Sequence, residues 1–518
     1  MNKSISMQAD GLIAHLDRVQ EHISSSGQEV SVEGLRGSAI AFFLSRLHQL
    51  EKGRPVLVVA NDQNRVENLL EDFKYFFHYL NLKTKPFDFP SWELLPYELS
   101  SPLNEISGER LEILNRLKNG ENIFLIASVE SIMQTVVPRN SLHRNVFTIQ
   151  PNDEMERELL EASLTDNGFL RSSLVENRCE FSVRGDIVDF FQPGADNPIR
   201  IEFFGDTIES VREFDAFSQI SINKLKGVDI LPVRELCLNH TEMQLGGEKI
   251  SSRSDELGLD NKQTMELQEK IDNLGFFSGM EFLAPFFFNT RETIFDYLPQ
   301  NTIIALDEPD LVMEKSNQFE NLVNTEFESC IEKGRVAAAP KELYLSSDEL
   351  LDKCRSLHGP VLLNSLKIAE ADGFLDGLGI KQIPQLAGNF DLFTEQVLRW
   401  SKEEQKIVIV APTKGQIRRI HELMNEWELE VDVDIGRLSD GFHFKSANLV
   451  FIAEHEIFGR SHKHRHRKKS NSQSFQRGLK DLKKGDYLVH VDYGIGLYLG
   501  TKDIKTGMGS GEFLHIQY

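Results

Sequence analysis

The glycine-containing segment Gly34-Leu35-Arg36-Gly37-Ser38 lies where a loop that holds a phosphate group could sit. Such a loop follows a strand and opens a helix. It needs glycines for close backbone approach, a lysine for the β- and γ-phosphates and a hydroxyl for Mg²⁺. The best register places Gly37 at the lysine position and Ser38 at the hydroxyl position. Because phosphoryl chemistry without the lysine loses its main charge clamp, we interpret Gly34, Gly37 and Ser38 as a degenerate nucleotide loop, a tight turn in a nucleotide fold that has lost its activity.

Two acids, Asp307 and Glu308, follow the apolar stretch that starts at Asn301. At the carboxyl end of a buried strand, such a pair can organise Mg²⁺ for phosphoryl transfer. Without a lysine-bearing loop to partner them, the acids have no nucleotide to act on, and we favour a structural role for both. Because no Ser/His/Asp or Cys/His constellation is visible either, we predict no catalytic residue, no metal and no cofactor within these 518 residues.

Three histidines, His462, His464 and His466, alternate with basic residues in a polar run that lacks periodicity. On a strand, this spacing could converge three imidazoles on a metal ion. The intervening lysines and arginines would repel a cation, and no second shell of supporting groups is visible. We interpret residues 461–477 as an exposed basic linker, with weak contact to a nucleic-acid backbone as the main alternative.

Arg184 lies in a stretch whose residues alternate like those of an antiparallel strand. The alternation places Arg184 and Ser182 on one side of that strand and Phe181 on the other. An exposed arginine near exposed aromatic rings is the composition of a protein-interface hot spot. The alternative is a solvated arginine beside ordinary core phenylalanines, and the composition alone leaves both interpretations open.

The elements around these residues predict domains of different classes. Short apolar runs that alternate with helices, at residues 55–61, 122–127 and 301–308, predict a parallel sheet covered on both faces. Residues 178–191 and 198–214 alternate instead like antiparallel strands and predict an inserted α+β module.

A further α/β unit and a small barrel complete the predicted order. The apolar runs 405–412 and 447–453 indicate the α/β unit, and a period of two between glycines over residues 484–500 indicates the short, bent strands of a barrel. About forty residues rarely bury enough surface to stand alone, so we expect the barrel to be cut short.

We therefore predict an α/β multidomain chain with a degenerate RecA/helicase-like parallel-sheet domain, an inserted α+β module, a further α/β domain and a truncated small β-barrel at the C-terminus. The predicted segments are 1–145 and 223–335 for the two parts of the parallel-sheet domain, 146–222 for the inserted module, 336–460 for the further α/β domain, 461–477 for the linker and 478–518 for the barrel.

The composition narrows the classes of function. The formal net charge is −23, which argues against the whole chain wrapping duplex DNA, because phosphate neutralisation needs a basic face. No apolar run approaches the roughly 20 residues that span a bilayer. No secretory signal is visible, and the four cysteines are scattered, as is usual in a reducing compartment. We therefore predict a cytoplasmic protein with protein partners and no membrane contact.

The order of these motifs resembles the N-terminal half of the bacterial transcription-repair coupling factor family. Residues 92–97 (Trp-Glu-Leu-Leu-Pro-Tyr) and 106–111 are similar to the first module of that family, which resembles the damage-recognition helicase UvrB. Residues 181–193 and 199–206 match the UvrB-like insert that binds UvrA. Residues 485–500 fit the start of the domain that docks on RNA polymerase, which is similar to the CarD family.

This resemblance implies that the chain binds UvrA and links it to RNA polymerase stalled at DNA lesions, in transcription-coupled nucleotide-excision repair. It makes Arg171, Arg184 and Phe191 candidates for the UvrA-binding surface. It also makes Lys502 and Ile504 candidates for docking on the polymerase β subunit by main-chain strand addition.

In this family an ATP-dependent DNA translocase motor binds ATP and Mg²⁺ and makes most of the DNA contacts, and we expect that motor to lie beyond the residues of this chain. The chain by itself is then expected not to be an enzyme. Two alternatives remain open. A UvrB-like damage-recognition ATPase would need a phosphate-binding lysine and an aromatic-rich hairpin. A CarD-like transcription regulator would carry unrelated N-terminal domains.

Overall fold

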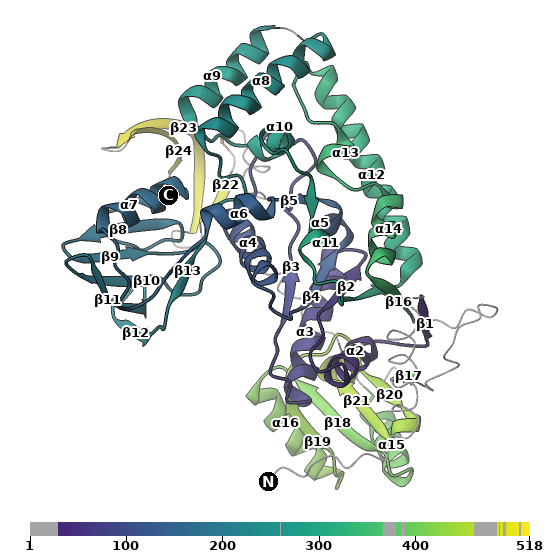
Figure 1. Cartoon of the computed structure of the whole chain (residues 1–518). Coiled ribbons are helices and arrows are strands. Elements are labelled where there is room, and N and C mark those ends of the chain that lie inside the picture. The colour runs from purple at the N-terminus through teal and green to yellow at the C-terminus, as the bar shows by residue number, and fades with distance from the viewer. Residues whose placement is uncertain are drawn as a thin grey trace. The chain divides into compact units, whose positions relative to one another are not determined.

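The computed structural model of the chain describes residues 29–259, 261–365, 380–384, 389–459, 484–485, 487–490, 494–506 and 509–517. The chain divides into two compact units, Met1–Ile457 and Phe458–Tyr518 (Figure 1). The predicted basic linker 461–477, with His462, His464 and His466, lies outside the described residues.

A six-stranded parallel sheet forms the centre of the first unit, with strand order β1-β16-β15-β2-β4-β3. Its strands are β1 (Val30–Glu33), β2 (Val56–Ala60), β3 (Pro86–Phe89), β4 (Phe124–Ser128), β15 (Ile303–Asp307) and β16 (His358–Asn364). All residues of β2, β4 and β15 are buried, as expected where helices cover both faces of a parallel sheet. The predicted mixed α/β class with a parallel sheet is therefore confirmed.

The helices that follow these strands are α2 (Ala39–Leu50), α3 (Gln63–Tyr79), α4 (Asn104–Lys118), α5 (Val129–Met133), α12 (Pro309–Glu332), α13 (Pro340–Leu343) and α14 (Ser347–Ser356). Several begin at a capping side chain; Asp62, for example, accepts a hydrogen bond from the Arg65 amide at the start of α3. In the part of the chain that the structure describes, no helix is both long and apolar enough to span a bilayer.

Strand β16 joins the first sheet, although its residues fall in the predicted further α/β domain 336–460. It lies between β1 and β15, with Val361 opposite both Val30 and Ala305. Strand β16 is not among the strands predicted from the sequence, and an apolar run by itself does not say which sheet a strand joins, because every buried parallel strand is an apolar run of similar length.

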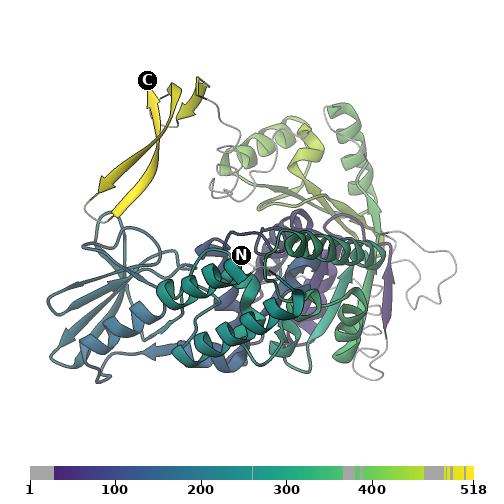
Figure 2. The ribbon, with the colours of Figure 1, turned by 90° about the horizontal axis from the view of Figure 1, so that it is seen from above.

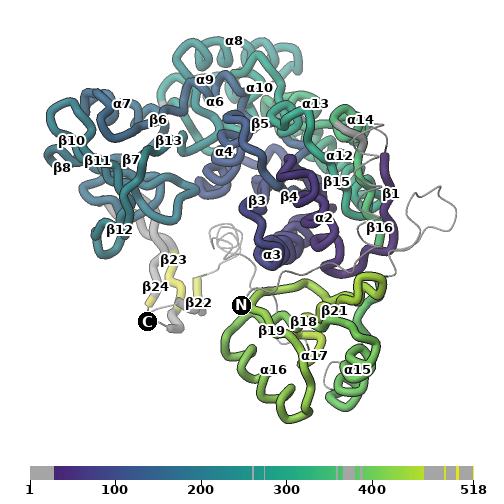
Figure 3. The backbone as a smooth tube through the Cα atoms, turned by 60° about the horizontal axis from the view of Figure 1, so that its bottom comes forward, coloured from purple at the N-terminus to yellow at the C-terminus, as the bar shows by residue number. Residues whose placement is uncertain are grey.

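A second sheet, antiparallel except at one edge, forms the inserted module. Its order is β12-β11-β10-β9-β8-β7, and its elements are α7 (Arg157–Asp166), β7 (Leu170–Arg171), β8 (Glu180–Arg184), β9 (Ile187–Phe190), β10 (Ile199–Phe204), β11 (Thr207–Phe214) and β12 (Ser221–Lys224). The chain enters through β6 (Phe147–Ile149) and leaves through β13 (Val228–Ile230), which pair antiparallel as a neck (Figure 3). Gly205, with φ +60°, forms the tight turn between β10 and β11.

The module also contacts helix α4 through two glycines. A Cβ atom added to Gly108 of α4 would lie 2.6 Å from the amide nitrogen of Gly194 and 2.6 Å from Cγ of Pro193. Both atoms belong to the loop after β9, so at this position only a residue without a side chain lets the module approach α4 this closely.

Gly108→Ala is therefore expected to lower the free energy of unfolding by about 1–3 kcal/mol, because backbone atoms of the module would have to move. Gly415→Ala is the matched control: this glycine is also helical, and its added Cβ would meet only Thr413 Oγ at 4.0 Å. The control should be neutral or slightly stabilising. Thermal unfolding of the two variants checks the expectation, and equal midpoints would contradict it.

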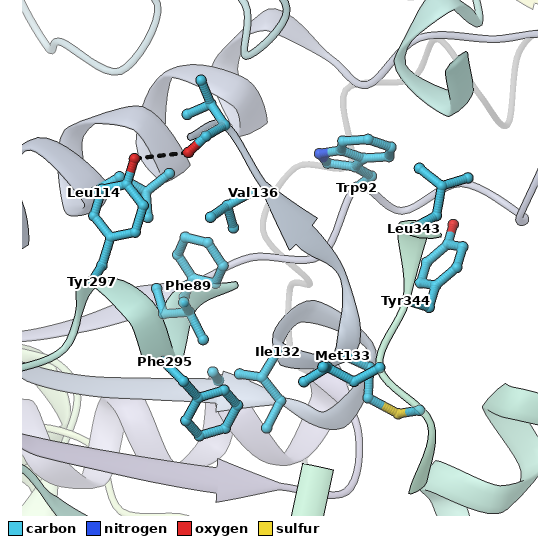
Figure 4. Close-up of a cluster of buried hydrophobic side chains, with 14 of the residues drawn as sticks. Phe89, Trp92, Leu114, Ile132, Met133, Val136, Phe295, Tyr297, Leu343 and Tyr344 are labelled. Atoms are coloured by element: carbon cyan, nitrogen blue, oxygen red, sulfur yellow. Dashed lines mark hydrogen bonds between the residues drawn. The ribbon is translucent and has the colours of Figure 1, made fainter. Parts of the chain in front are cut away.

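The chain returns from the module through a mainly helical segment. Its elements are α8 (His240–Leu257), α9 (Asn261–Leu274), η1 (Met280–Leu283), α10 (Ala284–Phe287), β14 (Glu292–Thr293) and α11 (Ile294–Tyr297), together with β5 (Thr135–Val136) and α6 (Arg139–Asn145) from before the module. Helices α8 and α9 lie side by side (Figure 2). The segment completes a large apolar core, in which the Tyr297 hydroxyl donates a 2.7 Å hydrogen bond to the Val137 carbonyl (Figure 4).

A third sheet forms the further α/β unit, with order β17-β20-β21-β18-β19. Its elements are β17 (Ile380–Gln382), α15 (Phe390–Lys402), β18 (Lys406–Ala411), α16 (Lys414–Glu426), β19 (Asp432–Ile435), β20 (Phe442–Phe444), η2 (Lys445–Ala447), β21 (Leu449–Ala453) and α17 (Glu454–Phe458). Strands β21, β18 and β19 run parallel, and β17 and β20 pair antiparallel at one edge.

In the second unit the described residues form a three-stranded antiparallel sheet, β22 (Tyr487–His490), β23 (Gly494–Thr506) and β24 (Gly509–Gln517). The predicted strands are present, but the described part of the chain contains no closed barrel. Three strands cannot close a barrel, since closure needs enough strands to pair the last with the first.

Candidate functional site

The sheet of the inserted module has one apolar face and one charged face. Helix α7 packs on the apolar face, where Phe181, Val188, Ile201 and Val211 are buried in one core cluster. The neighbouring residues of each strand point to the other face, because side chains alternate along a strand. We call this second face the arginine face and define it by Arg184, Asp189, Arg200, Glu202, Phe204 and Arg212.

Asp189 is the centre of the arginine face. Its side chain is fully buried and accepts hydrogen bonds from two arginines. Arg200 donates through Nε to Oδ1 at 2.7 Å and through Nη2 to Oδ2 at 2.9 Å, and Arg184 donates through Nη2 to Oδ2 at 2.7 Å. Strand register causes the convergence, because Asp189 of β9 lies directly opposite Arg200 of β10.

A second ion pair extends the charged face across β10 and β11. Arg212 lies 2.8 Å from Glu202, and Ser210 Oγ donates a 2.6 Å hydrogen bond to the same carboxylate. Phe204 ends strand β10 on the side of Arg200 and Glu202, and 80% of its surface is exposed. The face thus combines three guanidinium groups, two carboxylates and an uncovered aromatic ring.

The two central arginines differ in how firmly they are held. The hydrogen bonds that Arg200 donates to Asp189 raise the pKa of Arg200 above its ordinary value, and the Arg200 guanidinium lies 4.4 Å from the centre of the Phe214 ring. Arg184 makes one bond to Asp189 and leaves 43% of its side chain exposed. Arg184 can therefore donate its remaining N–H groups to a partner while Arg200 fixes the acid beneath it.

The sequence-predicted surface residues do not all lie on this face. Arg184 does. Arg171 is exposed but pairs with Glu161 of α7 at 3.1 Å, on the opposite side of the sheet. Phe191 is only 7% exposed and packs against Val175 and Phe214. Its ring supports the edge of the arginine face from beneath and offers little surface to a partner.

Sequence reasoning passed over Arg200, Phe204 and Arg212. The sequence contains a signal for two of these residues, because every second position of a regular β-strand is occupied by Arg200, Glu202 and Phe204. That spacing puts all three on one face. The strand order could not be read from the spacing, and only that order places Arg200 beside Asp189.

The residues of the predicted degenerate nucleotide loop lie between β1 and α2. Gly34 and Gly37 both have positive φ, +79° and +57°. The Ser38 amide donates a 3.2 Å hydrogen bond to the carbonyl oxygen of Asp440. Ser38 is fully buried.

The acid at the end of β15 also has a partner within the chain. Asp307 Oδ2 and Oδ1 accept hydrogen bonds of 2.6 and 3.1 Å from Nε and Nη2 of Arg65. Glu308 Oε1 accepts a hydrogen bond from the Ser365 amide. In the described ranges, no cluster of three or more His, Cys, Asp or Glu side chains has the arrangement of a metal site.

The two candidate polymerase-docking residues lie on β23 of the second unit. Lys502 is opposite Phe513 and Ile504 is opposite Gly511 in the pairing with β24. Strand β22 pairs only with residues Gly494–Leu497 of β23. Among the described residues, the other edge of β23 has no partner strand at Lys502 and Ile504.

Two protein families match parts of the chain. The family model of the UvrB interaction domain matches residues 147–236, which include the inserted module and its neck. The model of the CarD-like/TRCF RID domain matches residues 482–518, which include β22, β23 and β24.

Curated relatives match almost the whole chain. A transcription-repair-coupling factor of Myxococcus xanthus is 30% identical over 95% of this chain and 44% of its own length. The factor of Bacillus subtilis is 24% identical over 95% of this chain and 43% of its own length, and that of Staphylococcus epidermidis is 25% identical over 98% and 45%. The chain thus spans less than half the length of these relatives.

Proposed function

Because the chain is related along 95% of its length to the transcription-repair-coupling factors and carries UvrB interaction and CarD-like domains, we propose that it is the part of such a factor that binds UvrA and links it to RNA polymerase. The process it serves is transcription-coupled nucleotide-excision repair, in which a polymerase stalled at a DNA lesion is the signal for repair.

The observation that carries the UvrA proposal is the arginine face. Exposed Arg184 and Phe204 flank a buried ion-pair network on the side of the sheet that α7 does not cover. Arginine and aromatic side chains fixed in place from below are typical of interface hot spots, since little side-chain entropy is lost when a partner binds. This face lies within the segment that matches the UvrB interaction domain.

The polymerase proposal rests on the second unit. Residues Lys502 and Ile504 would offer β23 to an edge strand of the polymerase β subunit, with main-chain hydrogen bonds for affinity and alternate side chains for selection. We further propose that the three strands are the beginning of a small barrel, and that the parallel-sheet domain is a RecA/helicase-like fold without nucleotide chemistry. The partners that the Ser38 amide and the Asp307 carboxylate have within the chain support the second point.

On this proposal the chain has an adaptor role, and ATP, Mg²⁺ and most DNA contacts belong to a translocase motor outside these 518 residues. The alternative of a UvrB-like ATPase would need Asp307 free for Mg²⁺, whereas Arg65 holds both of its oxygens. No described feature favours a CarD-like regulator with unrelated N-terminal domains.

Retention of two purified partners on the immobilised chain tests the proposal. The whole chain is expected to retain both UvrA and RNA polymerase, and a chain that ends at Ile457 is expected to retain UvrA alone, since the two units are separate compact bodies. Failure of the whole chain to retain UvrA would overturn the adaptor function, and polymerase retention by the shorter chain would overturn the role given to the second unit.

A further inference from the structure

A turn of the further α/β unit lies against the degenerate nucleotide loop. A Cβ atom added to Gly37 would be 2.9 Å from the carbonyl oxygen of Gly441 and 3.2 Å from that of Asp440. The Asp440 carbonyl also accepts the hydrogen bond of the Ser38 amide. Two carbonyl oxygens therefore approach the start of α2, where the partial positive charge of a helix N-terminus would otherwise attract a phosphate.

The same turn is fastened to helix α3 by a buried carboxylate. Asp72 Oδ1 accepts a 2.7 Å hydrogen bond from the Ser439 amide, and Asp72 Oδ2 accepts a 2.6 Å bond from the Ser439 hydroxyl. Asp72 is completely buried, and this burial raises its pKa to about 7. A carboxyl group so far from water needs these two donors, which fixes the position of the turn.

An apolar interface surrounds the turn. Phe42 of α2 and Phe76 of α3 pack against Phe442 and Phe451 of the further α/β unit, with ring centres 5.2–6.2 Å apart. Residues of both sheets share one hydrophobic cluster, which joins β1, β2 and β15 to β18, β20 and β21. The further unit therefore shares a hydrophobic core with the first domain.

We propose that the Ser439–Gly441 turn is the resident occupant of the degenerate nucleotide loop, and that the further α/β unit serves to close this site permanently. Main-chain carbonyls take the place that phosphate oxygens have in an active loop, so the Ser38 amide is satisfied without a nucleotide. This assigns a role to a unit whose sequence carries no chemical motif, and it is independent of UvrA and polymerase binding.

A pair of glycine variants of the whole chain tests the proposal. Gly37→Ala places a methyl group against the turn, whereas Gly34→Ala has nothing within 4 Å of its added Cβ. Both glycines have positive φ, so both variants carry a similar backbone penalty. Hydrogen exchange of the Ser38 and Ser439 amides, which bond to Asp440 and Asp72, reports directly on whether the turn is seated.

We expect Gly37→Ala to accelerate exchange of both amides by about tenfold or more relative to Gly34→Ala, because the clash of the added methyl group opens the turn. Equal exchange in the two variants would overturn the proposal. Millimolar MgATP should leave both amides unchanged in the unaltered chain, and protection of Ser38 by MgATP would show that the site accepts nucleotide and would also overturn it.

If Gly37→Ala does not fold, Ser439→Ala provides a second test of whether the turn is seated. Loss of the hydroxyl bond to Asp72 should accelerate exchange at the Ser38 amide as well, because the turn moves as one piece. Ser401→Ala, at an exposed position of α15, is the control and should change neither amide. An effect of Ser439→Ala confined to its own amide would contradict the proposal.

Discussion

Replacing Arg184 and Phe204 together by alanine is expected to weaken the binding of UvrA by about a thousandfold, since hot-spot side chains each contribute about 2 kcal/mol or more. The two side chains are largely exposed. Asp189 keeps its two hydrogen bonds from Arg200 when Arg184 is removed, so the fold of the module should survive. Titration of the immobilised chain with purified UvrA measures the change.

The matched control is Arg171→Ala combined with Phe217→Ala. These residues have the same chemical types in the same module and are also exposed, with Phe217 at 99%. Arg171 lies on the α7 side of the sheet, and Phe217 follows the opposite end of β11. The control pair should bind UvrA within about twofold of the unaltered chain. A larger loss with the control than with Arg184 and Phe204 would contradict the assignment of the binding surface to these two residues.

Arg110→Ala is expected to destabilise the first unit by about 3–5 kcal/mol, the usual effect of removing one partner from a buried ion pair. The Arg110 side chain has no exposed surface, and its Nε lies 2.6 Å from Glu235 Oε1. The same carboxylate accepts a 2.8 Å hydrogen bond from the Trp92 indole. Because Arg110 is on α4 and Glu235 follows the neck, the pair fixes the base of the inserted module. Calorimetry of the whole chain measures the loss.

Arg116→Ala provides the control on the same helix. Arg116 pairs with Glu112 and Glu121, but 34% of its side chain is exposed, so its loss should cost about 0.5 kcal/mol. Arg110→Met combined with Glu235→Leu should recover most of the stability lost in Arg110→Ala, because the double change leaves no charge buried. Similar losses from Arg110→Ala and Arg116→Ala would mean that the buried pair does not hold the module.

The sequence predicts strands β2, β4 and β15 of the parallel sheet, because burial on both faces leaves an unbroken apolar run such as Val56–Ala60. The hairpin around Gly205 is equally visible, since alternation and a turn glycine are local signals. Arg184 could be selected on the same local grounds. The partners of Arg184 on the arginine face could not be selected in this way, because Asp189 and Arg200 meet only through the pairing of β9 with β10.

Contacts between segments that are distant in the sequence account for the remaining differences between the predicted and the observed structure. Nothing near Ser439 indicates that its amide will bond to Asp72, and nothing near Val361 indicates that it will lie beside Val30. The resemblance makes Phe191 a candidate for the UvrA-binding surface, whereas packing against Phe214 buries its ring. Patterns of burial within one element can be read locally, but the choice of partner is decided by the whole fold.

The neck of the inserted module has a consequence for the order in which a growing chain folds. Strands β6 and β13 bracket one continuous segment, so every partner of the module's sheet has been synthesised once β13 emerges from the ribosome. Strand β1 can pair only after β16 has been synthesised, because Val30 pairs with Val361. Such long-range parallel pairing is also slow. The arginine face is therefore assembled first during translation, while the sheet that carries the nucleotide loop is still incomplete and its apolar strands need protection from aggregation.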